Sequence, residues 1–186
     1  MRVAAADIDA LGRDDIVLVG HSMAGLAIAG VIDLVHARLR HVALVSCVVP
    51  PHGQSLLDML PPEIRAIAEA GEPTPGGVAL DEASIRAMQC ADMSEEQAAF
   101  TVSVVVPEAY WPIREPVDLT GFERLVPLTW IELRDDQTFP PEMQQEMAKR
   151  AKSTATIPLA SGHVAMISHP EDLAAALNSI HRAAFA

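Results

Sequence analysis

The feature that most restricts the fold of this chain is a short apolar strand that runs directly into a glycine-rich turn and then into a helix of small residues. Residues 16–19 (Ile-Val-Leu-Val) form a continuous, largely β-branched run that stops at Gly20, which is typical of a strand buried on both faces of a parallel sheet. The turn is Gly20-His21-Ser22-Met23-Ala24-Gly25, and residues 24–29 begin a helix. This order of elements predicts a βα unit with a serine at its turn.

The alternation of strand and helix recurs later in the chain. Further apolar runs predict strands at residues 41–46, 127–133 and 154–159. Helical patterns follow the first, third and fourth strands, at residues 26–39, 142–151 and 171–184. Strands that alternate with helices of about ten or more residues imply a parallel sheet with helices on both faces. The expected fold class is therefore α/β.

A long insertion separates the second and third expected strands. It covers residues 50–124 and contains most of the prolines, together with the helix-breaking run Pro73-Thr74-Pro75-Gly76-Gly77. Within it, helical composition occurs at residues 62–70, 81–90 and 94–101, and Ser94 and Gln97 have the spacing of a capping box. A domain usually has roughly 100–200 residues. We therefore expect a single domain, residues 1–186, with a helical cap inserted at residues 50–124.

The turn at residues 20–25 fits the pattern G-x-S-x-G, in which a strained strand-to-helix turn presents a serine as a nucleophile. About 0.06 chance matches are expected in a chain of this length, so the flanking strand and helix carry most of the argument. The alternative is a glycine-rich turn in which Ser22 only caps the following helix. A serine at its ordinary pKa is a poor nucleophile, so the catalytic interpretation requires a base and a carboxylate from elsewhere in the chain.

Candidates for both partners follow the last two strands, in the order acid then histidine that hydrolases with this turn require. Asp135 and Asp136 come after the third expected strand, and His163 comes after the fourth. Because the carboxyl ends of parallel strands meet at one edge, these side chains should converge on Ser22. Either aspartate fits the acid position, and the other would cap the following helix. The alternative for His163 is a turn residue bonded to water or to backbone.

The composition excludes several classes of function. Lys plus Arg number 13 and Asp plus Glu number 25, so the net charge is −12 and the surface repels nucleic acids and anionic lipid heads. The longest uncharged apolar run, residues 16–29, is shorter than the roughly 18 residues of a membrane span, and the first residues do not resemble a secretory signal. Cys47 and Cys90 form no C-x-x-C pair, and no His/Cys cluster has metal-ligand spacing. We expect a cytoplasmic protein that binds no nucleic acid, membrane, metal or cofactor.

Several segments together resemble the α/β-hydrolase superfamily, and more narrowly its branch of methylesterases and hydroxynitrile lyases. They are residues 19–25, residues 50–55 at the start of the cap, the acid loop at 134–142, and residues 161–163 leading to 168–173. In that branch the catalytic acid lies three residues before the phenylalanine of its loop, which here selects Asp136 before Phe139. The resemblance implies Ser22 as the nucleophile and His163 as the general base and then acid. It also implies that Asp136 fixes the imidazole tautomer and that the Met23 N–H is an oxyanion donor.

These residues predict a serine hydrolase that cleaves a small carboxylic ester through an acyl-enzyme. A hydroxynitrile lyase is a less favoured alternative, because lyases of this branch carry a lysine immediately after the catalytic histidine, and Val164 stands there in this chain. A third alternative, from a different class, is a catalytically impaired truncated hydrolase or a binding domain.

The residues before the serine strand favour this third alternative. Residues 3–11 have the pattern of a helix, and the 15 residues before the strand are too few for a preceding strand, loop and crossover helix. We therefore expect the chain to contain the C-terminal half of the sheet, without the strands that normally supply the second oxyanion donor. The strand at residues 16–19 would then be an apolar edge, for which we expect self-association and weak activity.

Overall fold

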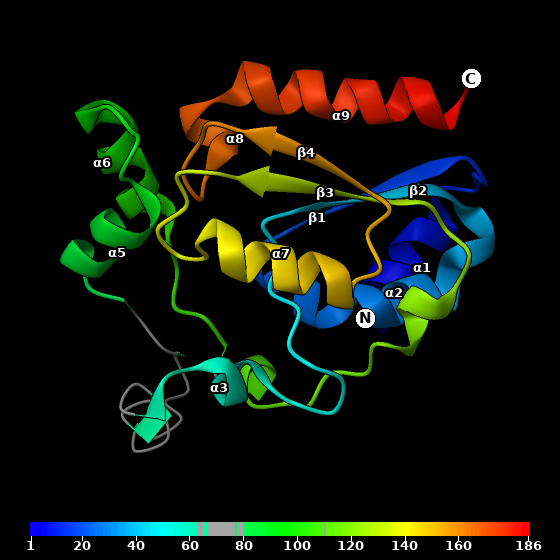
Figure 1. The fold of residues 1–186 in the computed structure, drawn as a ribbon, viewed down its shortest axis with the longest axis horizontal. Coiled ribbons are helices and arrows are strands. Elements are labelled where there is room, and N and C mark those ends of the chain that lie inside the picture. Colours follow the sequence, from blue (N-terminus) through cyan, green and yellow to red (C-terminus); the bar gives the residue numbers. More distant parts are fainter. Residues whose placement is uncertain (63–64, 67–76, 78–79, 110) are drawn as a thin grey trace.

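A four-stranded parallel sheet forms the centre of the molecule in the computed structural model, which describes residues 1–62, 65–66, 77, 80–109 and 111–186 (Figure 1). The strands are β1(Ile16–His21), β2(Leu39–Val45), β3(Leu128–Leu133) and β4(Ala155–Leu159). They lie side by side in chain order, and each neighbouring pair runs parallel. The carboxyl ends of all four strands therefore meet at one edge of the sheet. The predicted α/β class is confirmed.

Helices cover both faces of this sheet (Figure 1). On one face lie α2(Gly25–Val35) and α7(Pro141–Arg150), with α1(Arg2–Ala10) packed against α2. On the other face lie α8(Ala165–Ser168) and α9(Pro170–Ala184). In the described part of the chain, no helix is long and apolar enough to cross a bilayer.

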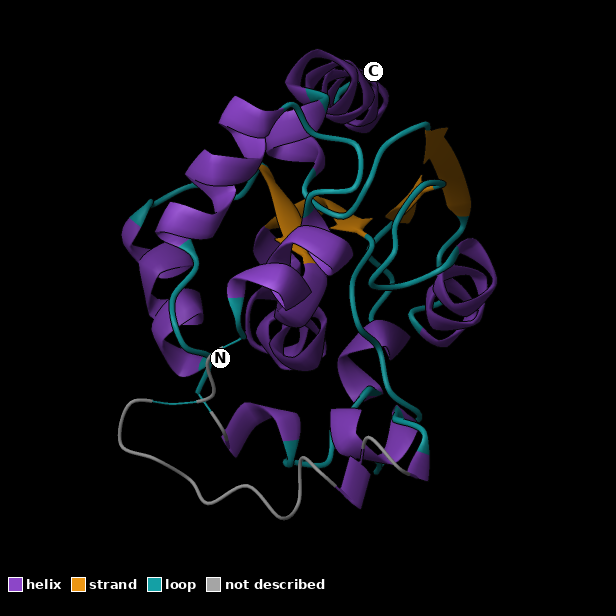
Figure 2. Cartoon of the chain, turned by 90° about the vertical axis from the view of Figure 1, so that its left-hand side faces the viewer, coloured by secondary structure: helices purple, strands orange, loops and turns teal. Residues whose placement is uncertain are grey.

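The strand β2 shows how one apolar run serves two cores. Val42 and Leu44 belong to the cluster that includes residues of α2 and α7, whereas Ala43 and Val45 belong to the cluster that includes residues of α8 and α9. All four side chains are buried. Because successive side chains of a strand point to opposite faces, a continuous apolar run fits a sheet that is covered on both sides. Figure 2, viewed from the side of the strand carboxyl ends, shows the strands with helices around them.

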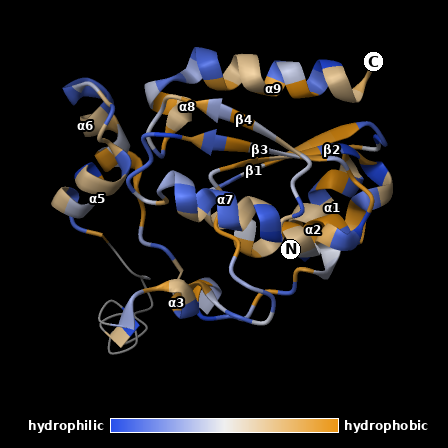
Figure 3. Ribbon diagram, in the orientation of Figure 1, coloured by the Kyte–Doolittle hydropathy of each residue, from blue (hydrophilic) through white to orange (hydrophobic). Residues whose placement is uncertain are grey.

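The strand β1 departs from the prediction that residues 16–19 are buried on both faces. It is an outer strand of the sheet, with β2 as its only strand neighbour among the described residues. Val19 is 45% exposed, and the other residues of the run are only half-buried. Figure 3 shows hydrophobic residues along both β1 and β2, although only β2 lies between two strands. The prediction of burial on both faces was wrong, because an apolar run is buried only where other elements cover it. The strand is instead an apolar edge of the sheet, which the residues before it had led us to expect.

The helix after the serine turn is shorter than predicted. It ends at Val35, the 3₁₀ turn η2(His36–Arg38) follows, and Leu39 opens β2 opposite Ile16. Leu39 is buried, so its apolar character fits a strand end as well as a helix stripe. The position of this boundary is set by the pairing of β1 with β2, which local periodicity does not contain.

The described part of the segment between β2 and β3 consists of short helices joined by loops. It contains α3(Leu56–Met59), α5(Glu82–Gln89), α6(Glu95–Val104) and the 3₁₀ turns η3(Trp111–Ile113) and η4(Thr120–Glu123). The helices predicted at residues 81–90 and 94–101 are present, and the capping box of Ser94 and Gln97 forms with bonds of 3.2 and 2.9 Å. Most of the helix predicted at 62–70 lies outside the described residues. Figure 1 places α5 and α6 beyond the carboxyl ends of β3 and β4.

Candidate active site

The serine of the G-x-S-x-G turn stands on a strained corner between β1 and α2. The φ angle of Ser22 is 51°, in the left-handed region that residues with a side chain rarely adopt, and the 3₁₀ turn η1(Ser22–Ala24) follows it. His21 occupies the N-cap position of η1 and Ala24 that of α2, so Ser22 is not a helix cap in this structure. The geometry is that of a turn which holds its serine side chain away from the helix that follows.

Two glycines allow this corner to close. A Cβ at Gly25 would lie 2.1 Å from the carbonyl oxygen of Val48, so the start of α2 packs directly on the backbone that follows β2. A Cβ at Gly20 would lie 2.6 Å from Cδ1 of Ile28. Close packing therefore explains why glycine occupies the motif positions on either side of the serine.

The acid loop after β3 distinguishes the two aspartates. Asp136 is only 2% exposed, whereas Asp135 is exposed. Oδ1 of Asp136 accepts hydrogen bonds from the N–H groups of Thr138 and Phe139 at 2.7 and 3.0 Å. The following helix α7 has Pro140 at its N-cap and no side-chain cap bond, so neither aspartate serves as its cap.

The second carboxylate oxygen of Asp136 faces the histidine. Oδ2 accepts from Nδ1–H of His163 at 2.8 Å and from the hydroxyl of Ser46 at 2.6 Å. Burial raises the pKa of Asp136, but the hydrogen bond and positive charge of His163, together with the Ser46 hydroxyl, outweigh it and hold the pKa below its ordinary value. The carboxylate is therefore ionised at neutral pH, and its location is set by four donors.

The histidine after β4 joins the acid to the serine. His163 is 4% exposed, and its Nε2 lies 2.9 Å from Oγ of Ser22. Because an ionised carboxylate only accepts hydrogen bonds, Nδ1 of the neutral imidazole carries the proton and Nε2 accepts from the serine hydroxyl. Ser22, His163 and Asp136 thus form one chain of hydrogen bonds at the carboxyl edge of the sheet, although 114 positions separate Ser22 from Asp136.

Two supporting residues were missed by the sequence analysis. His21 lies beside the site: its Nε2–H donates to the carbonyl oxygen of His163 at 2.8 Å, and the two ring centroids are 4.8 Å apart. Burial, reinforced by the charge of a protonated His163, lowers the pKa of His21 to about 4. Ser46, the donor to Asp136, directly follows β2 and has a φ of 37°. Its place at the carboxyl end of a central strand is the signal that would have identified it.

A buried amide holds the acid loop in place. Gln144 of α7 is inaccessible to solvent, and its Oε1 accepts from the N–H of Leu133 at 3.0 Å. Its Nε2 donates to the carbonyl oxygens of Leu133 and Phe139, both at 2.7 Å. The side chain therefore bridges the end of β3 and the end of the acid loop. Sequence analysis treated Gln144 only as a helix residue, because the contact joins positions that no local pattern connects.

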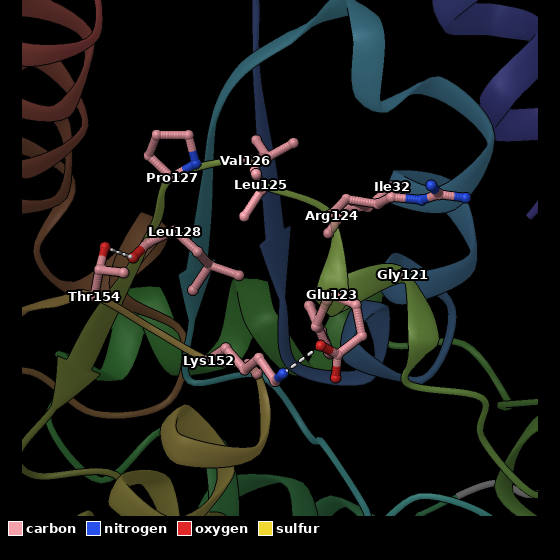
Figure 4. Close-up of a pocket in the computed structure, with 12 residues that line it drawn as sticks. Ile32, Gly121, Glu123, Arg124, Leu125, Val126, Pro127, Leu128, Lys152 and Thr154 are labelled. Carbon is pink, nitrogen blue, oxygen red and sulfur yellow. Dashed lines mark hydrogen bonds and ion pairs between the residues drawn. The ribbon is translucent and has the colours of Figure 1, made fainter.

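The cavities described next lie outside this chain of hydrogen bonds. One, of about 350 Å³, is lined by residues of 121–128 with Lys152 and Thr154, at the amino ends of β3 and β4 (Figure 4). It is at the opposite end of the sheet from Ser22. Another, of about 500 Å³, borders the serine turn at Met23 and has walls from α2 and from residues 112–120. Met23 is the half-buried neighbour of Ser22 in η1, so the second cavity adjoins the site without containing the triad side chains.

Known proteins resemble this chain in sequence and in fold. The chain is 41% identical over 63 residues to a carbendazim hydrolyzing esterase of Nocardioides sp. (strain SG-4G), a match that covers 32% of this chain and 26% of that relative. The fold matches an extracellular alpha/beta-hydrolase from a Paenibacillus species with a TM-score of 0.82 at 22% identity, over 96% of this chain and 76% of that one. It matches polyneuridine aldehyde esterase with a TM-score of 0.71 at 16% identity, over 89% and 71%.

The strongest assignment comes from the family profile, which spans nearly the whole chain. The profile described as "Alpha/beta hydrolase family" matches residues 2–176. These residues include β1 to β4, the serine turn, the acid loop and the histidine loop. The resemblance noted in the sequence is confirmed: this chain belongs to the alpha/beta hydrolase family.

Proposed function

We propose that this chain is a serine esterase that cleaves a small carboxylic ester through an acyl-enzyme. The observation that carries the proposal is the continuous hydrogen-bond chain in which Oγ of Ser22 lies 2.9 Å from Nε2 of His163 and Nδ1 of His163 lies 2.8 Å from Oδ2 of Asp136. The esterases among its similar proteins support the same reaction class.

The geometry supplies each proton transfer of the reaction. Oγ of Ser22 attacks the ester carbonyl carbon while its proton passes to Nε2 of His163, and Asp136 stabilises the imidazolium that forms. When the tetrahedral intermediate collapses, Nε2 returns the proton to the leaving alkoxide and the alcohol departs. Water then attacks the acyl-enzyme with its proton passing to His163, and a second collapse releases the carboxylic acid and restores the serine hydroxyl.

The charge that develops on the carbonyl oxygen needs hydrogen-bond donors. We assign the backbone N–H of Met23, the residue after the nucleophile, as one donor, as the turn geometry requires. The second donor in hydrolases of this architecture comes from a loop that precedes the serine strand, and we assign none to α1 or to the turn after it. Loss of one donor costs about 10²–10³-fold in kcat, so we expect the 186 residues alone to turn over slowly.

The substrate we propose is a small ester in solution. The similar proteins include a carbendazim hydrolyzing esterase, polyneuridine aldehyde esterase and a methylesterase from Arabidopsis. The net charge of −12 opposes binding to nucleic acids and to anionic membranes, and we keep the prediction of a cytoplasmic location. The branch of methylesterases is the part of the family that this proposal favours.

A fluorophosphonate probe tests the proposal directly, because it labels only a serine that a base has activated. We expect the chain to be labelled, the labelling to disappear in Ser22→Ala, and the rate of labelling to fall by several orders of magnitude in His163→Ala. Hydrolysis of p-nitrophenyl acetate should follow the same order. Labelling that persists in Ser22→Ala would place the nucleophile elsewhere, and a folded chain that never reacts would favour the binding-domain alternative.

A further inference from the structure

A carboxylate from the α5–α6 turn reaches the loop that carries His163. Oδ2 of Asp92 accepts a hydrogen bond of 2.6 Å from the N–H of Gly162, the residue immediately before His163. The same oxygen lies 3.2 Å from Nδ1 of His169, which precedes α9. Ser161 adds a longer contact of 3.5 Å from its hydroxyl. One carboxylate oxygen of Asp92 therefore contacts a residue before His163 in the sequence, Gly162, and a residue after it, His169.

The second carboxylate oxygen of Asp92, Oδ1, packs closely against Gly162. A Cβ at Gly162 would lie 2.4 Å from Oδ1 of Asp92, so the glycine leaves room for the carboxylate. Oδ1 is buried and has no hydrogen-bond partner among the described residues, which is unfavourable for a charged group. Burial raises the pKa of Asp92, yet the Gly162 N–H, the Ser168 hydroxyl and the charge of His169 bring it below its ordinary value. The ionised form is thus the one that this pocket of donors stabilises.

Two neutral hydrogen bonds extend the same attachment. Nε2 of Gln97 in α6 donates to the carbonyl oxygen of Ile167 in α8 at 2.8 Å. The hydroxyl of Thr138 in the acid loop donates to the carbonyl oxygen of Met88 in α5 at 2.9 Å. The α5–α6 pair is therefore hydrogen-bonded to both loops that carry the partners of Ser22. Figure 1 shows this pair beyond the carboxyl ends of β3 and β4.

We propose that Asp92 is a positioning residue that keeps the imidazole of His163 aligned between Asp136 and Ser22. The inference rests on the proposed function, since it assigns Asp92 to the alignment of that function's general base. The imidazole must satisfy two partners, at 2.8 and 2.9 Å, from a loop with no regular secondary structure. A displacement of about 1 Å costs on the order of 10²-fold in rate. The cap segment thus contributes to catalysis through this loop and is not only a cover over the site.

The kinetic test compares three variants in single-turnover acylation by p-nitrophenyl acetate, with rates normalised to the serine sites that a fluorophosphonate labels. In Asp92→Ala we expect the saturating acylation rate to fall about 10–100-fold while the half-saturating ester concentration changes less than about threefold. Asp92→Asn should lose about 3–10-fold, because an amide oxygen still accepts from Gly162 but carries no charge for His169. Asp81→Asn is the matched control: Asp81 caps α5 through Ser84, is exposed, and its side-chain cap bond stays within the cap.

A spectroscopic readout separates this proposal from the proposed function. The Nδ1 proton of His163, held by Asp136, gives a low-field NMR resonance that does not depend on ester turnover. We expect it in the unmodified chain and in Asp81→Asn, and shifted or broadened in both Asp92 variants. If the unmodified chain shows the resonance but hydrolyses no ester, the esterase proposal fails while the resonance still tests Asp92.

The outcome against the positioning role is equally clear. Unchanged acylation per labelled serine together with an unchanged resonance in Asp92→Ala would overturn it. If Asp92→Ala fails to fold by circular dichroism, Asp92→Asn carries the decision, because it preserves shape and the bond to Gly162. An Asp92→Asn protein that equals the unmodified chain in both readouts would also overturn the inference.

Discussion

The imidazole of His21 donates a hydrogen bond of 2.8 Å from its Nε2 to the backbone carbonyl oxygen of His163. The residue before Ser22 therefore holds the backbone of His163, so β1 and the histidine loop are joined by this side chain as well as by the hydrogen bond between Ser22 and His163. Donation requires a proton on Nε2, and the low pKa that burial gives His21 keeps the ring neutral above about pH 4.

This buried neutral histidine makes stability depend on pH. Unfolded His21 binds a proton below its ordinary pKa of 6.5, whereas folded His21 binds one only below about 4. Between these values protons favour the unfolded chain, so the free energy of unfolding falls by on the order of 2–3 kcal/mol as the pH falls from 6.5 to 4.

The variant His21→Gln tests this prediction and should lose less stability over the same interval, as measured by urea unfolding at pH 7, 5.5 and 4. His41, whose pKa is also lowered by burial, contributes equally to both proteins. Parallel pH profiles would refute the prediction.

The choice of catalytic acid predicts opposite outcomes for two adjacent substitutions. Asp136→Asn removes the acceptor that holds His163 Nδ1–H, so we expect kcat for p-nitrophenyl acetate to fall by about 10⁴-fold. Asp135 is exposed, and both of its hydrogen bonds within the described part of the chain use its backbone: its N–H donates to the carbonyl oxygen of Ser161, and its carbonyl oxygen accepts from Nε2 of Gln137. Asp135→Asn should therefore change kcat by less than about threefold. The reverse order would move the acid to position 135.

The close approach of α2 to the backbone after β2 predicts a position-specific cost for alanine. Gly25 has a φ of −57°, so alanine there meets no backbone strain, but its Cβ would lie 2.1 Å from the carbonyl oxygen of Val48. We expect Gly25→Ala to lose about 3 kcal/mol or more in urea unfolding. Gly30 in the same helix is the control, because its Cβ would meet the flexible Met1 side chain. Alanine favours a helix by about 1 kcal/mol, so Gly30→Ala should stay within about that amount of the parent. Equal losses at both positions would contradict the steric explanation.

The exposed edge of β1 predicts association between copies of this chain. An apolar outer strand offers unpaired N–H and C=O groups to another strand, and Val19 is 45% exposed on it. We expect sedimentation velocity to show concentration-dependent association that Val19→Lys reduces. Leu34→Lys is the matched control, because Leu34 is 54% exposed but lies on α2. A monodisperse monomer at every concentration would exclude the edge as a contact.

The residue after His163 predicts which of two related reactions is absent. Val164 is half-buried and apolar, so it offers no charge to a departing cyanide ion. We expect no cyanide release from mandelonitrile by the unmodified chain. Cyanide release that disappears in Ser22→Ala would show that the lyase alternative is correct.

Local sequence determined the parallel sheet and the order of its site residues. The four strands lie within about two residues of their predicted ranges, because continuous apolar runs bounded by glycine and proline carry that signal in adjacent positions. The strand-turn-helix pattern around Ser22, followed by an acid and then a histidine after later strands, specified where three side chains would meet. Local reasoning left Asp135 and Asp136 as equals, since both occupy the same loop and only the resemblance favoured Asp136.

Tertiary structure decided everything that depends on residues brought together from distant parts of the chain. Burial of Asp136 and exposure of Asp135 follow from the positions of Ser46 and His163, and the roles of His21 and Gln144 follow from partners on other elements. The contact of Asp92 with Gly162 joins positions 70 residues apart. Val19 is a residue type typical of buried strands, but it lies on an outer strand and is exposed. Burial depends on which neighbours cover a strand and not on the strand's own sequence.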